Sequence, residues 1–186
     1  PETVFTFLLR DDVRWHDGHP FDARDVLFTF RCTKNPHVPC AQRFSSDKLE
    51  RCEALGPHAV RFTLARPYFQ ARAIFEGLTL QPAHLLDLSD PDNPDHRSGA
   101  SPEEQALYLV EHPVNRRWVG LGPYRLTEVG DTRIDAERFP GYFDPERRGH
   151  FDAVTWRIIR DDHAAFVALQ NGELDFSARV TAEDYF

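Results

Sequence analysis

The chain has 186 residues and a mass of 21.5 kDa, a length that predicts one or two domains. Apolar residues make up 41% and charged residues 28%, which is an ordinary globular composition and excludes a disordered tail. No run approaches the ~18 consecutive apolar residues of a membrane-spanning helix. The net charge of −8, with no run of Lys or Arg to offset it, argues against nucleic-acid binding.

The two ends of the chain predict that it is a piece of a longer protein. The sequence contains no Met, opens on Pro1-Glu2 without a signal-like segment, and closes on Tyr185-Phe186 with no terminating structure.

Strand, turn and helix signals follow one another in the first 36 residues. The apolar run 4–9 predicts a strand, and the polar residues 15–18 predict a turn. Asp22 fits a helix N-cap with Asp25 at the third helical position, so we expect a helix to about residue 34. Asn35-Pro36 ends it, because the residue before a proline avoids helical backbone.

A hairpin and a loop dominate the next 65 residues. Residues 49–54 and 60–64 predict two antiparallel strands across Gly56-Pro57, since apolar and polar residues alternate along the second strand. Residues 82–88 suggest a brief helix. Residues 89–101, rich in Asp, Pro and Ser, predict an exposed loop.

The last third mixes strands and helices. Ser101, with Glu104 three residues later, predicts a capped helix to about Glu111, and Asp161 or Asp162 caps another through Gln170. Without a clean β-α-β repeat, this order predicts a mixed α/β or α+β domain. The expected strands are 124–128, 134–139, 154–159 and 174–176.

The three cysteines fit no zinc-binding spacing. Cys32 and Cys40 bracket a short proline-containing loop that a disulfide would close, whereas Cys52 reads as a small buried hydrophobe. Three reduced thiols in a reducing cytosol is the alternative.

Three constellations are tempting sites, and for each the structural interpretation is favoured. His16 and His19 are three residues apart in a turn with no third ligand nearby, so we expect an exposed turn and no metal. Asp161-Asp162-His163 lies where helix caps are needed. Gly120–Pro123 resembles a phosphate loop, but a strand follows it, so no nucleotide site is expected. The residues alone therefore predict no active site, no cofactor and a mild preference for a binding module.

The ordered motifs resemble one family, the extracytoplasmic solute-binding proteins (family 5) of ABC transporters for oligopeptides, dipeptides and nickel. The resemblance covers essentially the whole chain. It rests on F-x-L-R-x-x-V-x-W-H-D-G-x-P-F at 7–21, A-x-D-V-x-F-T-F at 23–30, V-x-F-x-L at 60–64, P-V at 113–114, G-x-G-P-Y-x-L at 120–126, and A-L-x-x-G-E-L-D at 168–175.

The resemblance implies a type II periplasmic-binding-protein fold in which two lobes close around a solute. Residues 1–115 would form the small subdomain and 116–186 part of the first lobe, with the N-terminal segment and second lobe absent. The implied function is non-catalytic capture of a peptide or related small solute for a membrane permease. It further implies a periplasmic or extracytoplasmic, membrane-associated monomer, with a lipid anchor outside these residues in a lipoprotein parent.

The same resemblance suggests which residues line the cleft. By position these are Val38–Phe44 and Ser177–Val180, with Arg43 and Arg179 paired to a carboxylate of the ligand. For each arginine an ordinary surface role is the alternative. The candidate ligand-binding residues are Cys40, Arg43, Phe44, Ser177 and Arg179.

An extracytoplasmic location also makes the Cys32–Cys40 disulfide reachable. Two other function classes stay open at this point. One is the ligand-sensing domain of a transcriptional regulator, because regulators borrow the same fold. The other is a metal-dependent hydrolase using His16 and His19.

Overall fold

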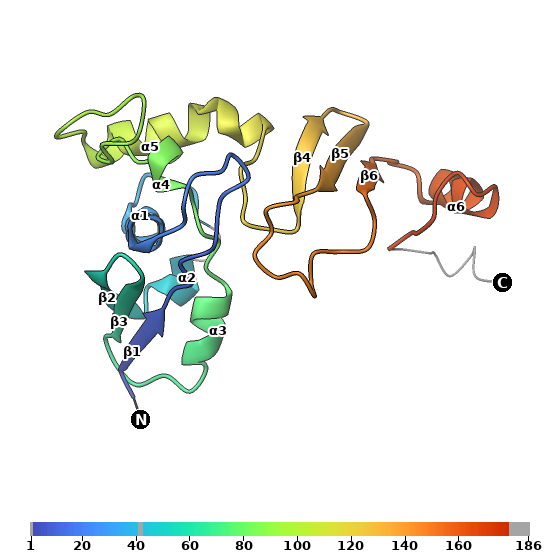
Figure 1. Ribbon diagram of the computed structural model, residues 1–186. Coiled ribbons are helices and arrows are strands. Elements are labelled where there is room, and N and C mark those ends of the chain that lie inside the picture. The colour runs from blue at the N-terminus through green and yellow to red at the C-terminus, as the bar shows by residue number, and fades with distance from the viewer. Residues whose placement is uncertain (1, 41–42, 179–186) are drawn as a thin grey trace.

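The structure, a computed structural model, describes residues 2–40 and 43–178. It has two parts, each built on its own three-stranded antiparallel sheet (Figure 1). Residues 2–116 form the first part, and residues 117–123 lead into the second. Helices and strands follow one another in a mixed order without a repeat, so the predicted mixed α and β fold is confirmed.

The first sheet has the strand order β1-β3-β2. Strand β1 (Val4–Leu8) pairs with β3 (Ala59–Leu64), which pairs in turn with β2 (Leu49–Gly56). The predicted hairpin is confirmed, although β2 extends through Gly56 and the turn falls at residues 57–58. The apolar positions that alternate along β3 point into the core as expected; these are Val60, Phe62 and Leu64.

Helix α1 (Ala23–Lys34) begins and ends where the sequence predicts. The side chain of Asp22 accepts a hydrogen bond from the backbone N–H of Arg24 at 2.7 Å, and that of Asp25 accepts one from the N–H of Asp22 at 3.1 Å. This reciprocal capping box satisfies donors that a helix start leaves unpaired. Asn35 then leaves the helical conformation, ahead of Pro36.

Helix α1 lies between the first sheet and the helices α4 and α5 (Figure 1), so it contributes to two cores. Val26 faces the sheet and packs with the buried Trp15 and Phe21. Phe28 and Cys32 face the other way. The second core is completed by Val38, Ala83, Leu86 and Ala106. The remaining elements of this part are α2 (Arg43–Ser46), α3 (Ala71–Glu76), α4 (Ala83–Leu86), α5 (Pro102–Glu111) and the 3₁₀ turn η1 (Pro113–Arg116).

The predicted loop 89–101 contains neither helix nor strand, and most of its residues are exposed as expected, with two exceptions. Asp90 and Asn93 are buried. The side-chain amide of Asn93 donates to the backbone oxygen of Asp87 at 3.0 Å, and the hydroxyl of Tyr108 on α5 donates to the Asn93 side chain at 3.3 Å. These bonds hold the loop against α5.

The second sheet has the strand order β4-β5-β6. Its strands are β4 (Tyr124–Val129), β5 (Arg133–Arg138) and β6 (Ala153–Arg157), close to the three predicted ranges. Helix α6 (Asp162–Gln170) follows, and the side chain of Asp161 accepts from the N–H of Ala164 at 2.7 Å, as a helix cap does. Residues 174–176, expected to be a strand, form none.

The two faces of this sheet differ in polarity. Residues opposite each other on neighbouring strands share a face, so the pairing of Ile134 with Trp156 and of Ala136 with Val154 and Leu126 makes one face apolar. On that face Trp156 is 50% exposed. The other face carries ion pairs, including Arg125–Glu137 at 2.5 Å.

Candidate functional site

Arg43, one of the predicted ligand-binding residues, lies at the start of α2 with its guanidinium directed at the end of α1. One Nη atom donates to the backbone oxygen of Thr33 at 3.0 Å, and the other donates to those of Asn35 at 2.8 Å and Val38 at 2.5 Å. Carbonyl groups at a helix end lack hydrogen-bond donors within the helix. The Arg43 guanidinium supplies these donors and holds the segment that follows α1 in place. Its role in ligand binding stays a prediction.

The other predicted ligand-binding residues occupy two separate places. Cys40 is half-buried between α1 and α2, and Phe44 is the second residue of α2. Ser177 is half-buried and follows α6, the element of the second part that lies farthest from α2 in Figure 1. Arg179 lies outside the described residues. The structure therefore does not bring the described parts of the two predicted stretches together. Of the first stretch it describes residues 38–40 and 43–44, and of the second it describes residues 177–178.

The cysteines carry no disulfide in the structure, so the Cys32–Cys40 bridge stays a prediction. Both side chains border the same small cavity of 120 Å³, and the charge of a Cys40 thiolate adds to the forces that raise the pKa of Cys32. Burial is the main cause, and it raises the pKa of the Cys32 thiol to about 12. Cys52 is half-buried against the first core, and burial raises its pKa to about 12 as well.

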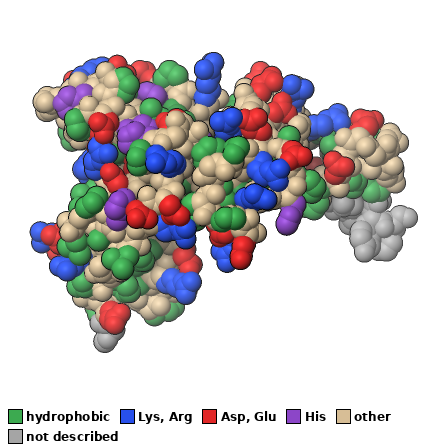
Figure 2. Space-filling model, viewed as in Figure 1, with side chains coloured by type: hydrophobic (Ala, Val, Ile, Leu, Met, Phe, Trp, Pro, Cys, Tyr) green, Lys and Arg blue, Asp and Glu red, His purple; other side chains and the backbone are tan. Residues whose placement is uncertain are grey.

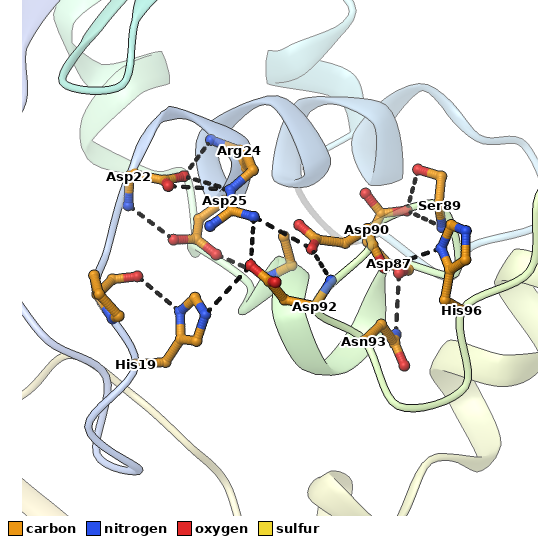
Figure 3. A network of polar contacts seen from close by, with 12 residues as sticks. His19, Asp22, Arg24, Asp25, Asp87, Ser89, Asp90, Asp92, Asn93 and His96 are labelled. Atoms are coloured by element: carbon orange, nitrogen blue, oxygen red, sulfur yellow. Dashed lines mark hydrogen bonds and ion pairs between the residues drawn. The ribbon is translucent and has the colours of Figure 1, made fainter.

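A network of carboxylates around Arg24 holds the 87–96 loop to the start of α1 (Figure 3). The guanidinium of Arg24 contacts Asp22 at 3.0 Å, Asp90 at 3.4 Å and Asp92 at 2.6 Å. The hydrogen bond to Asp92 and the charges of the other two raise the pKa of Arg24, and Arg24 in turn lowers the pKa of Asp92. This cluster of acids is therefore compensated by an arginine.

Asp25 connects three elements from the start of α1. Its carboxylate accepts hydrogen bonds from Trp15 Nε1 at 3.1 Å, from the N–H of Ala83 at 2.8 Å, and from the N–H of Asp22. The side chain is buried, and desolvation raises its pKa in spite of these donors. All three hydrogen-bond donors to this buried carboxylate belong to the protein's own backbone and core, so Asp25 has a structural role.

The histidines of the predicted turn are more structured than the sequence suggested. His19 stacks on His84 with ring centroids 3.8 Å apart, and His84 Nε2 lies 2.7 Å from a carboxylate oxygen of Asp17. His16 is half-buried against the second part, so the expectation of an exposed turn was wrong for this residue. Across residues 2–40 and 43–178, no group of three or more His, Cys, Asp or Glu side chains is placed to hold a metal ion.

A cavity lies in the first part, between α1 and α5. Its volume is 460 Å³, within the range of small-molecule sites. Phe28 and Pro102 contribute apolar walls, and the Arg31–Asp87 ion pair stands at its edge. None of the predicted ligand-binding residues whose side chains the structure describes lines it.

On the face drawn in Figure 2, acidic and basic side chains are interspersed, without a continuous basic area. Within the described part of the chain, no helix is long and apolar enough to cross a membrane.

This combination of a layered subdomain and a second, open sheet is that of a type II periplasmic binding protein. Among the solved structures of at least 25% sequence identity, two examples show the same fold. The oligopeptide-binding protein AppA of Bacillus subtilis, in complex with a nonapeptide, aligns over 98% of this chain and 33% of its own, with a TM-score of 0.80 and 25% identity. NikZ of Campylobacter jejuni, in complex with Ni(L-His), aligns over 93% of this chain and 31% of its own, with a TM-score of 0.73 and 25% identity.

All 186 residues match the sequence model described as "Bacterial extracellular solute-binding proteins, family 5 Middle". The chain belongs to this family, as the ordered motifs predict. The glutathione-binding protein GsiB of Shigella boydii is 26% identical over 181 residues, which is 97% of this chain and 31% of GsiB. The chain therefore spans about a third of the length of the curated relatives it matches.

Proposed function

We propose that the full-length protein is the solute-binding component of an ABC importer, which captures a peptide or related small solute and delivers it to a membrane permease. The observation that carries this proposal is the family match over residues 1–186, together with the fold shared with the nonapeptide complex of AppA. Binding and release between closing lobes needs no covalent chemistry. The protein is accordingly proposed to be non-catalytic, without a cofactor, and to work as a monomer outside the cytoplasm, held to the membrane by a lipid anchor.

Residues 1–115 are proposed to be the small subdomain, and residues 116–186 part of the first lobe. Support comes from the distribution of buried side chains: both apolar clusters are built from buried residues of the first part. Among the described residues of the second part, only Ala136 and Ala168 are buried hydrophobics. A sheet with one open apolar face is marginal alone, so we propose that further chain of the lobe covers this face.

The proposed cleft lining comprises the 38–44 and 177–180 segments. For the first segment, the three bonds of the Arg43 guanidinium support a rigid approach to the cleft, with Cys40 and Phe44 next to it. A preorganised loop costs less entropy on binding than a mobile one. Ser177 and Arg179 would contribute from the first lobe, and Arg179 is the residue proposed to meet a ligand carboxylate.

A ligand-sensing domain of a regulator is not supported by any observation made here. The family is one of extracellular solute-binding proteins, and the relatives named above include a glutathione-binding and an oligopeptide-binding protein.

The test is a thermal-shift screen of the full-length protein, refolded to remove any bound solute. The panel contains glutathione, di- to pentapeptides and a nickel–histidine complex, each at about 1 mM, where a ligand of about 10 μM Kd stabilises by about 2.7 kcal/mol. We expect one solute class to raise the Tm by several degrees, since about 1 kcal/mol shifts the Tm of a large domain by about 2–4 °C. No shift with any member would contradict the proposal.

A further inference from the structure

The contact between the two parts of the chain is centred on His16, which both accepts a hydrogen bond from the 120–122 segment and donates hydrogen bonds to it. Its Nδ1 lies 3.2 Å from the backbone nitrogen of Gly120, and its Nε2 lies 2.9 Å from the backbone oxygen of Gly122. The backbone N–H of His16 also donates to the oxygen of Gly120 at 3.0 Å.

These partners determine the protonation state that the contact needs. A backbone N–H can only donate, so Nδ1 must be an unprotonated acceptor, and a carbonyl can only accept, so Nε2 must carry the proton. The neutral ring with its proton on Nε2 satisfies both bonds. A proton on Nδ1 would place two donors face to face and remove the bond from Gly120.

The surroundings of the ring favour the neutral form. Burial is the main cause that lowers the pKa of His16, and Arg125 on β4 lowers it further. The bond from the ring to the Gly122 carbonyl and the neighbouring Asp17 act in the opposite direction. The uncharged ring of Phe139, which follows β5, also packs against the His16 ring, and the two ring centroids are 5.0 Å apart.

The segment is also shaped to admit the imidazole. A Cβ atom at Gly120 would lie 3.3 Å from Cε1 of His16, closer than most side-chain contacts allow. The other contacts across the joint need no particular protonation state of a histidine: Arg10 lies over the ring of Phe143, and Leu121 packs against the first core.

We propose that His16 is a pH-sensitive latch, defined by its side-chain bonds to Gly120 and Gly122, that fixes the subdomain to the first lobe when neutral and loosens the joint when protonated. Because the folded state disfavours the proton, the latch is intact above the ordinary histidine value of about 6.5 and is lost as pH falls below it. This proposal concerns the joint alone and does not depend on the solute proposed above.

The test is hydrogen–deuterium exchange of the full-length protein, read by mass spectrometry on peptides that cover residues 117–124. Protection is corrected for the intrinsic pH dependence of amide exchange. We expect the protection of the Gly120 amide to fall about tenfold between about pH 7.5 and about pH 5, the effect of losing one hydrogen bond.

The decisive variant is His16→Gln, whose side chain keeps one acceptor and one donor but cannot titrate in this range. In this variant the protection of the Gly120 backbone amide should not change with pH, whether or not the glutamine side chain reproduces both hydrogen bonds of His16. The control is His19→Gln, a neighbouring histidine that does not contact the segment and should leave the tenfold fall in place. An undiminished fall in His16→Gln, or no fall in the parent protein, would overturn the proposal.

Discussion

At the scale of single residues, the side chains with the most partners serve the scaffold. Asp25 joins the Trp15 turn, the start of α1 and the start of α4 through three accepted hydrogen bonds. Arg43 does the same for the end of α1. In each case one charged side chain replaces the partners that a helix end lacks.

Asp25→Ala should destabilise the first part strongly, because it leaves three donors without an acceptor. At about 1 kcal/mol or more for each unsatisfied buried group, we expect a loss of about 3 kcal/mol in the free energy of unfolding. Urea unfolding followed by tryptophan fluorescence measures it, since the buried Trp15 reports on the same site.

The matched control for this variant is Asp12→Ala, which removes an exposed carboxylate paired with Arg10. Exposed pairs contribute little, so this variant should unfold close to the parent. Equal effects of the two substitutions would contradict the role assigned to Asp25.

Gly149 is required by its backbone conformation and by its neighbour. Its φ is +81°, a region that side chains disfavour, and a Cβ atom there would overlap the ring and hydroxyl of Tyr124. That hydroxyl is held by the N–H and carbonyl groups of Phe151. Gly149→Ala should therefore cost about 2–4 kcal/mol in urea unfolding. Gly56→Ala, where no atom lies within 4 Å, is the control and should cost far less.

At the scale of elements, the sequence predicts best the helices whose ends are encoded locally. Helices α1, α5 and α6 begin at Asp22, Ser101 and Asp161, each of which accepts a hydrogen bond from the helix it starts. The short helix α3 has no side-chain cap bond of this kind, so no local pattern in the sequence predicts it. The apparent strand at 174–176 has no neighbouring strand to pair with among the described residues.

The candidate site was less predictable than the fold. Nothing local to Arg43 shows that three backbone oxygens around the end of α1 surround its guanidinium. Likewise, the partners of His16 lie more than 100 positions away, at Gly120 and Gly122. The one available signal was the spacing of two glycines before Pro123, which predicts a close backbone approach without naming what approaches.

The cysteines carry a prediction at this scale, because Cys32 and Cys40 connect the end of α1 to the segment before α2. We expect them to be linked in protein exported to an oxidising compartment, with a stabilisation of about 2–3 kcal/mol from the short closed loop. Cys52 should react with an alkylating reagent only after unfolding, because burial raises its pKa to about 12.

Alkylation with and without reductant, followed by peptide mass mapping, measures this linkage. A disulfide that includes Cys52, or three cysteines that all react in the folded exported protein, would contradict the assignment.

At the scale of the whole molecule, the chain spans about a third of the length of its family 5 relatives, with a packed first part and an open second part. Figure 1 shows the second sheet and α6 extending away from the layered subdomain. Tight binding needs contacts that surround most of a small ligand. We therefore propose that these 186 residues carry only part of the binding surface.

Calorimetry tests that claim most directly, by comparing the full-length protein with the 186-residue chain against the solute that the thermal-shift screen identifies. The account predicts that the full-length protein binds it with a Kd of about 10 μM or tighter, and that the 186-residue chain shows no binding tighter than about 1 mM, a difference of at least about 2.7 kcal/mol. Binding by the 186-residue chain alone with a Kd close to that of the full-length protein would contradict the claim.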